Sequence, residues 1–276
     1  VLTFADQRHP ELALTRPTLI NLMKQAGYKT FWITNQQTMT RRNTLLTTFA
    51  QQTDEAVYLN NSRFQNSISH DEVVLAPFEK ALADAAPKKF IIVHLLGTHM
   101  KYRFRYPDTY AHFTGTDAMP PNLSPEQIET RNSYDNAVRY HDTVLTRLIR
   151  DFEAQGDNGF LLYFSDHGEE MFDTPPHQTL GRNEGAPTRP MYEIPFLLWI
   201  PPHPQNPFAR DFSTLTARPY SIEHLIHTFS DLAGLSYDGY RPEASLVNPA
   251  FQPVPRLIGN PEQKRTLRDF DATLPP

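Results

Sequence analysis

The segment from Phe160 to Glu170 reads FLLYFSDHGEE, an apolar run that ends abruptly in an aspartate, a histidine and a glycine. The run is short, aromatic and free of charge, which is typical of a strand covered on both faces in a parallel sheet. In open α/β sheets, ligands bind just beyond the carboxyl ends of the strands. We therefore interpret this stretch as a buried strand that delivers two metal ligands, Asp166 and His167, to its carboxyl end.

Neighbouring residues of a regular strand point to opposite faces. Asp166 and His167 can therefore share one ion only if the chain leaves the pleat there, and Gly168, which has no Cβ, makes such a turn cheap. A carboxylate oxygen and a neutral imidazole nitrogen together suit Zn²⁺ or Mn²⁺ better than Ca²⁺. The alternative is a helix N-cap, in which Asp166 caps a following turn and His167 is an ordinary surface residue. The pair alone leaves both interpretations open.

Composition excludes several classes of function. The net charge of -5 and the pI near 6.1 do not indicate a basic surface that would bind nucleic acid. The sequence also lacks the block of Lys and Arg that would indicate binding to an anionic membrane. The 276 residues contain no cysteine, so cysteine catalysis, zinc fingers and disulfides are excluded. No apolar run approaches the roughly 18 residues that a membrane helix needs. The length allows one large α/β domain or two small ones.

Helical and strand patterns alternate along the chain. Helices are predicted over residues 15–27, 42–49, 70–85, 124–155 and 220–233. Strands are predicted over residues 28–34, 56–59, 90–96, 160–164 and 194–200, with a short pairing strand at 256–258. This alternation implies an α/β fold with a doubly wound, mainly parallel sheet sandwiched by helices. Because no convincing linker is present, we expect residues 1–276 to form a single domain.

Two of the predicted helices carry specific signals. Ser124 and Gln127 resemble a capping box with proline at the first helical position. The helix that follows is expected to carry Ile128, Val138, Leu145, Leu148, Ile149 and Phe152 on or near its buried face. In the helix over residues 70–85, Asp71 and Glu72 complement the dipole of the first turn. Pro77 predicts an early kink in that helix.

Histidines supply a second clue to a site. His94 and His99 lie at the end of the strand predicted over residues 90–96, and His177 lies in the loop that follows the Asp166–His167 pair. If both strands belong to one parallel sheet, these groups converge on one edge and form a metal or phosphate site. Each histidine also has a simpler interpretation, because His94 could be a hydrogen-bonded core imidazole and the other two could be solvated loop residues.

Basic residues next to these histidines fit an anionic substrate. Lys101, Arg103 and Arg105 follow His99 directly, and arginine offers bidentate contacts to phosphate oxygens. Arg41 lies beyond the end of the strand predicted over residues 28–34 and could face the same cleft. A solvated basic loop remains the alternative for all of them.

Three motifs occur in an order that resembles a known family. They are His94–His99 (HLLGTH) after one apolar strand, Asn132–Val138 (NSYDNAV) on the next long helix with Tyr140 and Asp142, and Ser165–Glu169 (SDHGE) after another strand. Together they resemble the phosphoethanolamine transferases of the alkaline phosphatase and sulfatase superfamily, over nearly the whole chain. Thr34–Thr38 (TNQQT) and Thr174–His177 (TPPH) are similar to the branch that modifies the heptose of the lipopolysaccharide inner core.

The resemblance implies a mechanism and a set of roles. A metal-activated threonine takes phosphoethanolamine from phosphatidylethanolamine and passes it, through a covalent phosphothreonine, to a sugar hydroxyl. Asp166 and His167 match the two late ligands of a metal, with Zn²⁺ expected and Mn²⁺ possible. His99, His177 and, less directly, His94 match residues that hold a second metal or the phosphoryl group, and Arg41, Lys101 and Arg103 are weak candidates for substrate contacts.

The same resemblance predicts what lies outside the chain. The nucleophilic threonine and an early acidic ligand of the family precede the Leu19 helix, upstream of Val1. Val1 is not an initiator residue, so we expect an N-terminally truncated soluble catalytic domain, inactive alone. The whole enzyme would be a monomer, anchored by upstream helices at the periplasmic face of the bacterial inner membrane. The absence of cysteine favours the core-sugar branch, since many relatives that modify lipid A are stapled by disulfides.

Two alternatives to the transferase remain open. One is a metal-dependent phosphatase, phosphodiesterase or sulfatase of the same superfamily, which the identity of the nucleophile would distinguish. The other is a non-catalytic domain that binds lipid headgroups or partners, in which case replacing Asp166 or His167 with alanine leaves function intact.

Overall fold

The computed structural model describes residues 1–36, 44–62, 64–117, 119–156, 158–202, 206–208 and 211–274. The chain divides into two compact units, each of which is described by itself. Unit 1 comprises residues 1–26, 157–170 and 182–276, and unit 2 comprises residues 27–156 and 171–181. No helix in the described part of the chain combines the length and the hydropathy needed to cross a bilayer.

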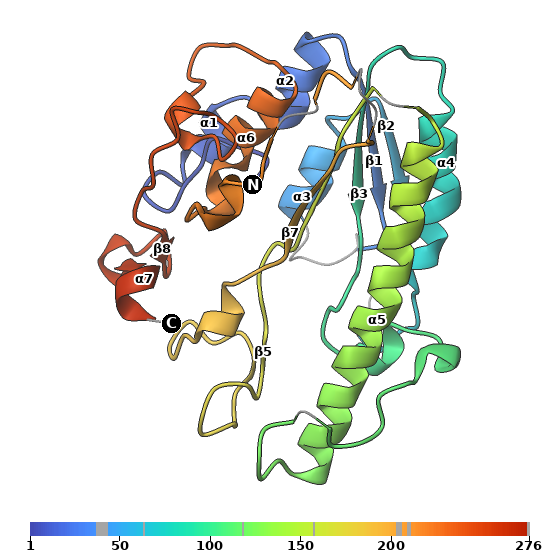
Figure 1. Ribbon diagram of the computed structural model, residues 1–276, viewed down its shortest axis with the longest axis vertical. Coiled ribbons are helices and arrows are strands. Elements are labelled where there is room, and N and C mark those ends of the chain that lie inside the picture. Colours follow the sequence, from blue (N-terminus) through green and yellow to red (C-terminus); the bar gives the residue numbers. More distant parts are fainter. Residues whose placement is uncertain are drawn as a thin grey trace. The chain divides into compact units, whose positions relative to one another are not determined.

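Unit 2 is built on a parallel sheet of three strands. These strands are β1 (Lys29–Thr34), β2 (Glu55–Tyr58) and β3 (Lys89–His94), in the order β2-β1-β3 (Figure 1). The register pairs Lys29 with Lys89 at one end of β1 and Thr34 with His94 at the other. The central strand is the apolar one, since Phe31, Trp32 and Ile33 on β1 are almost completely buried. These strands confirm the α/β class and the predicted parallel pairing.

Three helices of unit 2 flank this sheet, and two of them enclose a hydrophobic core with it. The helices are α3 (Thr44–Ala50), α4 (Leu75–Leu82) and α5 (Pro125–Glu153), and α4 and α5, which form the core, lie side by side next to the sheet (Figure 1). The core joins Phe31 and Ile33 of β1 to Phe78 of α4 and to Tyr140 and Leu148 of α5. Val138 was expected on the buried face of α5, but it is 42% exposed. The helix turns its small and polar residues inward instead, including buried Asn136 and Ala137.

The first residues of the helices in unit 2 show which local sequence signals predicted a helix start correctly. Both halves of the capping box between Ser124 and Gln127 are present at α5, as predicted. The helix predicted over residues 70–85 is divided into a 3-10 turn, Asp71–Val74, and α4. Pro77 therefore lies in the first turn of α4, where its missing N–H needs no partner, so it causes no mid-helix kink.

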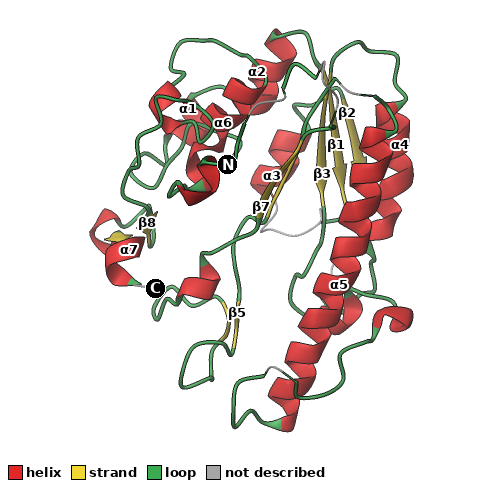
Figure 2. Cartoon of the chain, in the orientation of Figure 1, coloured by secondary structure: helices red, strands yellow, loops and turns green. Residues whose placement is uncertain are grey.

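Unit 1 contains short helices joined by long loops (Figure 2). Its elements are α1 (Leu12–Thr15), α2 (Leu19–Gln25), β4 (Leu161–Phe164), β7 (Phe196–Trp199), α6 (Leu225–Leu232), β8 (Leu257–Ile258), β9 (Arg268–Asp269) and α7 (Phe270–Thr273). The helix predicted over residues 15–27 begins only at Leu19, because the Thr18 side chain caps it in a capping box with Asn21. The short strand predicted at 256–258 is present as β8, paired with β9.

The strand that precedes Asp166 differs from its predicted environment. β4 pairs antiparallel with β7, in a register that sets Phe164 opposite Phe196, and its four residues are only partly buried. The prediction of a strand of a parallel sheet, covered on both faces, is therefore wrong for β4 within the described residues. A continuous apolar run predicts a strand, but the direction of its neighbour depends on a segment more than thirty residues later.

A two-stranded ladder lies where the two units meet along the sequence. β5 (Glu170–Met171) pairs with β6 (Leu180–Gly181), and the loop between them carries His177. Its base is also closed by a hydrogen bond from the Phe172 N–H to the Thr179 carbonyl, 3.1 Å.

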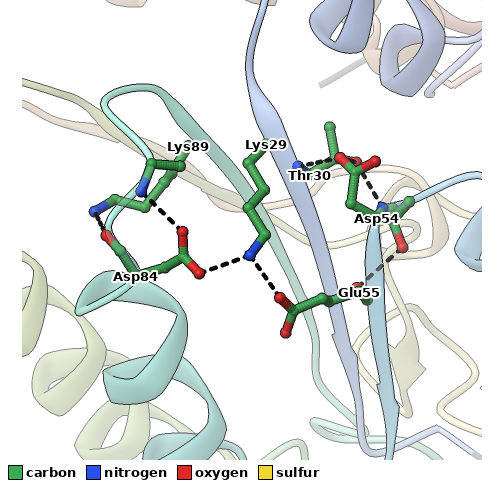
Figure 3. Close-up of polar contacts among 8 residues, drawn as sticks. Lys29, Thr30, Asp54, Glu55, Asp84 and Lys89 are labelled. Atoms are coloured by element: carbon green, nitrogen blue, oxygen red, sulfur yellow. Dashed lines mark hydrogen bonds and ion pairs between the residues drawn. The ribbon is translucent and has the colours of Figure 1, made fainter.

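At the amino end of the sheet in unit 2, side chains form hydrogen bonds and ion pairs with the first residues of β1 (Figure 3). The Asp54 carboxylate accepts hydrogen bonds from the Thr30 N–H, at 2.9 Å, and from the Thr30 hydroxyl, at 2.8 Å. The Lys29 ammonium lies 2.6 Å from both Asp84 and Glu55. Thr30 is completely buried, so Asp54 satisfies donors that water cannot reach.

We predict that Asp54→Ala lowers the free energy of unfolding by about 1–3 kcal/mol, because it leaves the buried donors of Thr30 without a partner. Chemical denaturation in urea measures this change. Glu55→Ala is the control, since it removes one partly exposed ion pair and leaves Lys29 paired with Asp84. An equal loss of stability in both variants would contradict the prediction.

Two histidines of unit 1, His224 and His227, are buried. His227 on α6 is 1% exposed, and both of its ring nitrogens lie 3.3 Å from N–H groups of Arg241. Burial lowers the pKa of His227 to about 3, and Arg241 and His224 act in the same direction. Burial also lowers the pKa of His224. Both imidazoles are therefore neutral in the folded chain at neutral pH.

The free energy of unfolding should decrease as the pH falls from about 6.5 toward about 3, because the unfolded chain takes up a proton in this range that folded His227 does not. The slope for one such group reaches at most about 1.4 kcal/mol per pH unit. Urea denaturation at pH 7, 6 and 5 measures it, and His227→Gln should flatten the decline. An unchanged slope in that variant would assign the acid sensitivity to other groups.

Candidate metal and phosphoryl site

Asp166 and His167 follow β4 in a bend of the chain, and no helix begins after them. The helix N-cap alternative is therefore wrong. The His167 N–H donates a hydrogen bond to Asp166 Oδ1 at 3.1 Å, and the same oxygen lies 3.9 Å from His167 Nε2. The chain thus leaves the pleat where the sequence required it to, and one carboxylate and one imidazole come together.

The orientation of His167 suits a metal ligand. Its Nδ1 lies 2.8 Å from the Gly168 carbonyl oxygen, which can only accept, so Nδ1 carries the proton of the neutral ring. The lone pair of Nε2 then faces away from the backbone on the side of Asp166. The two side chains are 81% and 38% exposed and line a cavity of about 900 Å³ within unit 1. A metal ion held by this pair could take further ligands from the open side.

Gly168 is needed for a different reason from the one predicted. A Cβ at this position would lie 2.1 Å from the Pro190 carbonyl oxygen and 2.6 Å from that of Glu193. The Gly168 N–H donates to the Met191 carbonyl at 3.1 Å, which draws the two backbones together. Close approach of the chain, rather than an unusual turn, requires glycine here.

His177 is held in the same way as His167. Its Nδ1 lies 2.8 Å from the Phe172 carbonyl oxygen, so its Nε2 is also the nitrogen that can bind a ligand. Gln127 of α5, a member of the capping box, donates to the His177 carbonyl at 2.9 Å. Arg131 of α5 donates to the Met171 carbonyl and pairs with Asp173. The long helix therefore positions the loop that carries His177.

His94 and His99 lie at the end of β3 and just beyond it. His94 Nδ1 is 3.2 Å from the Thr34 hydroxyl, and its ring packs edge-on against Trp32. The His99 carbonyl accepts a hydrogen bond from Arg105 Nε at 3.1 Å. Among the residues that the structure describes, no three His, Asp or Glu side chains gather into a group that could hold a metal. The structure thus brings Asp166 and His167 together, but the described residues of each unit form no complete ligand set.

The basic residues after His99 differ in burial and in their contacts. Arg105 is buried, and its guanidinium donates to the carbonyls of Gln65, Ser67, His99 and Met100, so the suggestion that it holds substrate is wrong. Arg103 pairs with Asp108 and lies over the Tyr106 ring. Lys101 is exposed and has a left-handed backbone, with φ of 69°. Arg41 lies outside the described residues.

The sequence did not predict a buried polar cluster that lies at the carboxyl ends of β1 and β3. Asp71 accepts the backbone N–H groups of Leu96 and Gly97 and the side-chain amide of Asn35. The sequence placed Asp71 only in the first turn of a helix, where an acid is common. No local signal distinguishes that position from one buried against the end of a strand.

Comparisons with known proteins place the chain in a family. The family model described as "Sulfatase" matches residues 1–235. The chain is 59% identical over 275 residues to phosphoethanolamine transferase EptC of Escherichia coli K12, and 60% identical to phosphoethanolamine transferase CptA of Salmonella typhimurium. Each alignment covers 99% of this chain but 48% of the relative, so the chain spans about half the length of the curated relatives it matches.

The structural comparison gives the same result. The crystal structure of the C-terminal periplasmic domain of E. coli EptC in complex with zinc superposes with a TM-score of 0.95 at 59% identity. It covers 99% of this chain and 77% of that domain. The fold is therefore that of the alkaline phosphatase and sulfatase superfamily, as the motifs predicted, and the chain belongs to the sulfatase family.

Proposed function

We propose that this chain is the larger part of the catalytic domain of a metal-dependent phosphoethanolamine transferase. The enzyme would move phosphoethanolamine from phosphatidylethanolamine to a heptose of the lipopolysaccharide core. One observation carries the proposal. The Asp166 carboxylate and the Nε2 of His167 lie together beyond the end of β4, in a chain 59% identical to a phosphoethanolamine transferase.

The donor set fits Zn²⁺. A carboxylate oxygen and an imidazole nitrogen whose partner Nδ1–H is fixed by a backbone carbonyl are ligands that zinc commonly takes, and Mn²⁺ accepts the same types of atom. When bound, such an ion lowers the pKa of a hydroxyl nucleophile and neutralises charge on a transferring phosphoryl group. Asp166 and His167 supply two ligands, whereas catalytic zinc sites usually have three from the protein.

The histidines of unit 2 complete the proposed roles. His177, with its Nε2 available, and His99 would hold the phosphoryl group or a second ion, and His94 would support them from β3. Lys101, which is exposed next to His99, is a candidate contact for the anionic substrate. Arg103 is a weaker candidate, because its guanidinium already pairs with Asp108.

The remaining ligand and the nucleophile would come from residues upstream of Val1. Thr3 does not suit the nucleophile's role, since it is buried and its hydroxyl accepts the N–H of Ala5. In the described part of the chain, β3 pairs with β1 and β4 pairs with β7. An upstream strand that pairs with both β3 and β4 would join the two sheets into one domain. This single-domain assembly is part of the proposal.

The setting of the reaction follows from its substrates. Both a phospholipid donor and a lipopolysaccharide acceptor are membrane lipids, so the domain would work at the periplasmic face of the inner membrane, as a monomer attached through upstream helices. The E. coli EptC domain that superposes on this chain is a periplasmic domain, and its crystal structure is a complex with zinc. Both facts support the proposal.

The covalent route predicts a phosphoethanolamine adduct on the full-length enzyme after incubation with phosphatidylethanolamine, because the group passes through a threonine ester. Intact-protein mass spectrometry detects the adduct, and peptide mapping should place it upstream of Val1. Addition of lipopolysaccharide core should discharge it. Active enzyme without an adduct would overturn the covalent route, and release of free sulfate from a sulfate ester would favour the hydrolase alternative.

Asp166→Asn and His167→Ala in the full-length enzyme should each lower transfer by more than about 100-fold, since changing even the outer partners of metal ligands costs roughly 10–100-fold. Bound zinc, measured by elemental analysis, should fall in parallel. His9→Ala is the matched control, because it removes an exposed histidine of unit 1 that also contacts a carboxylate, Glu11. Full activity in the Asp166 and His167 variants would favour a non-catalytic binding domain.

A further inference from the structure

A buried polar cluster joins the carboxyl ends of β1 and β3. Asn35 follows β1 and is completely buried, and Asp71 opens the 3-10 turn before α4 and is 5% exposed. The Asp71 carboxylate uses both of its oxygens. Oδ1 accepts the Asn35 side-chain N–H and the Leu96 N–H, each at 2.9 Å, and Oδ2 accepts the Gly97 N–H at 2.7 Å. The buried Asp71 carboxylate is therefore held by three N–H donors.

The other contacts of Asn35 determine which way its amide points. Its Oδ1 accepts the Ser69 hydroxyl at 2.8 Å, so its N–H group is the one that faces Asp71. Its backbone carbonyl accepts the Asn60 side chain at 3.1 Å, and its backbone N–H donates to the His94 carbonyl at 3.0 Å. Asn35 is thus anchored to β3 and to the segment after β2, and it orients the Asp71 carboxylate.

The segment that Asp71 holds leads directly to His99. The His99 N–H donates to the Leu96 carbonyl at 3.3 Å, and Gly97 between them has a φ of +59°, in the region that favours glycine. From the other side, the buried guanidinium of Arg105 donates to the carbonyls of His99 and Met100. The backbone on both sides of His99 is therefore fixed by a buried charged group.

We propose that Asp71, oriented by Asn35, is a positioning residue for His99: it acts on the reaction only by holding Leu96 and Gly97, and so the His99 imidazole, in place. This inference rests on the proposed role of His99 in phosphoryl or metal binding. It also assigns a role to the first residues of the TNQQT motif, of which Asn35 is one. An aspartate suits the task, because one carboxylate can accept from all three donors, whereas an amide has a single acceptor oxygen.

The test compares Asp71→Asn with Asp54→Asn in the full-length enzyme. Asp54 is the matched control, because it is a carboxylate that accepts a buried backbone N–H at the opposite end of the same strand, β1. Both variants should lose stability. Only Asp71→Asn should lower kcat, by roughly 10–100-fold with little change in KM, per mole of folded enzyme. Ser69→Ala, which removes one hydroxyl, should show a smaller decrease of the same kind.

Two further measurements separate positioning from general damage. Hydrogen exchange followed by mass spectrometry should be faster over residues 95–100 in Asp71→Asn but not in Asp54→Asn, and this measurement is independent of activity. In a His99→Ala background, Asp71→Asn should add roughly a threefold loss or less, because both changes act through one imidazole.

The outcomes distinguish this inference from the proposed function. Equal kcat in the two aspartate variants, or multiplicative losses in the double variant, would overturn the positioning role while leaving the transferase intact. Full activity of His99→Ala would remove both the role of His99 and this inference. An inactive wild-type enzyme would instead reject the proposed function, and the exchange data would still decide whether Asp71 holds residues 95–100.

Discussion

The parallel pairing of β1 with β3 is the constraint on which unit 2 depends. Its register sets Thr34 opposite His94, so the two strands end side by side and their following loops begin at the same edge. At each end of the pair, some backbone N–H and C=O groups have no partner in the ladder and need another hydrogen-bond partner. Asp54 does so at the amino end and Asp71 at the carboxyl end, and only the second of these lies beside candidate site residues.

Backbone carbonyls, rather than carboxylates, orient the two histidines that are best placed to bind a ligand. His167 in unit 1 and His177 in unit 2 both direct Nδ1 to a carbonyl oxygen at 2.8 Å, which leaves Nε2 for a ligand. Since a neutral carbonyl adds no charge, the charge at the proposed metal is supplied by Asp166 alone among these groups. The same geometry occurs in two separate loops. In both, the carbonyl fixes the tautomer that carries its proton on Nδ1, which a metal or phosphoryl ligand at Nε2 would require.

Three buried charged side chains in this chain hold backbone groups or neighbouring side chains in place. Arg105 bonds to four backbone carbonyls and Asp71 to two backbone N–H groups, and both act on the segment around His99. Glu170, next to the metal pair in sequence, is completely buried and accepts the Thr188 hydroxyl at 2.5 Å. Such residues resemble substrate-binding groups in the sequence, because burial is not a local property.

Local sequence patterns were enough to predict the α/β class, most element positions, the capping box at Ser124 and the bend that brings the Asp166 carboxylate near the His167 ring. These depend on periodicity and on neighbours a few residues away, which the chain displays directly. Three-dimensional packing was needed to show that β4 pairs antiparallel with β7, that Val138 faces solvent, and that Gly168 is needed for contact with residues 190–193. It was also needed to show the backbone contacts of Asp71 and Arg105. Each of these facts depends on segments far apart in the chain, which meet only when the backbone packs and its buried donors and acceptors find partners.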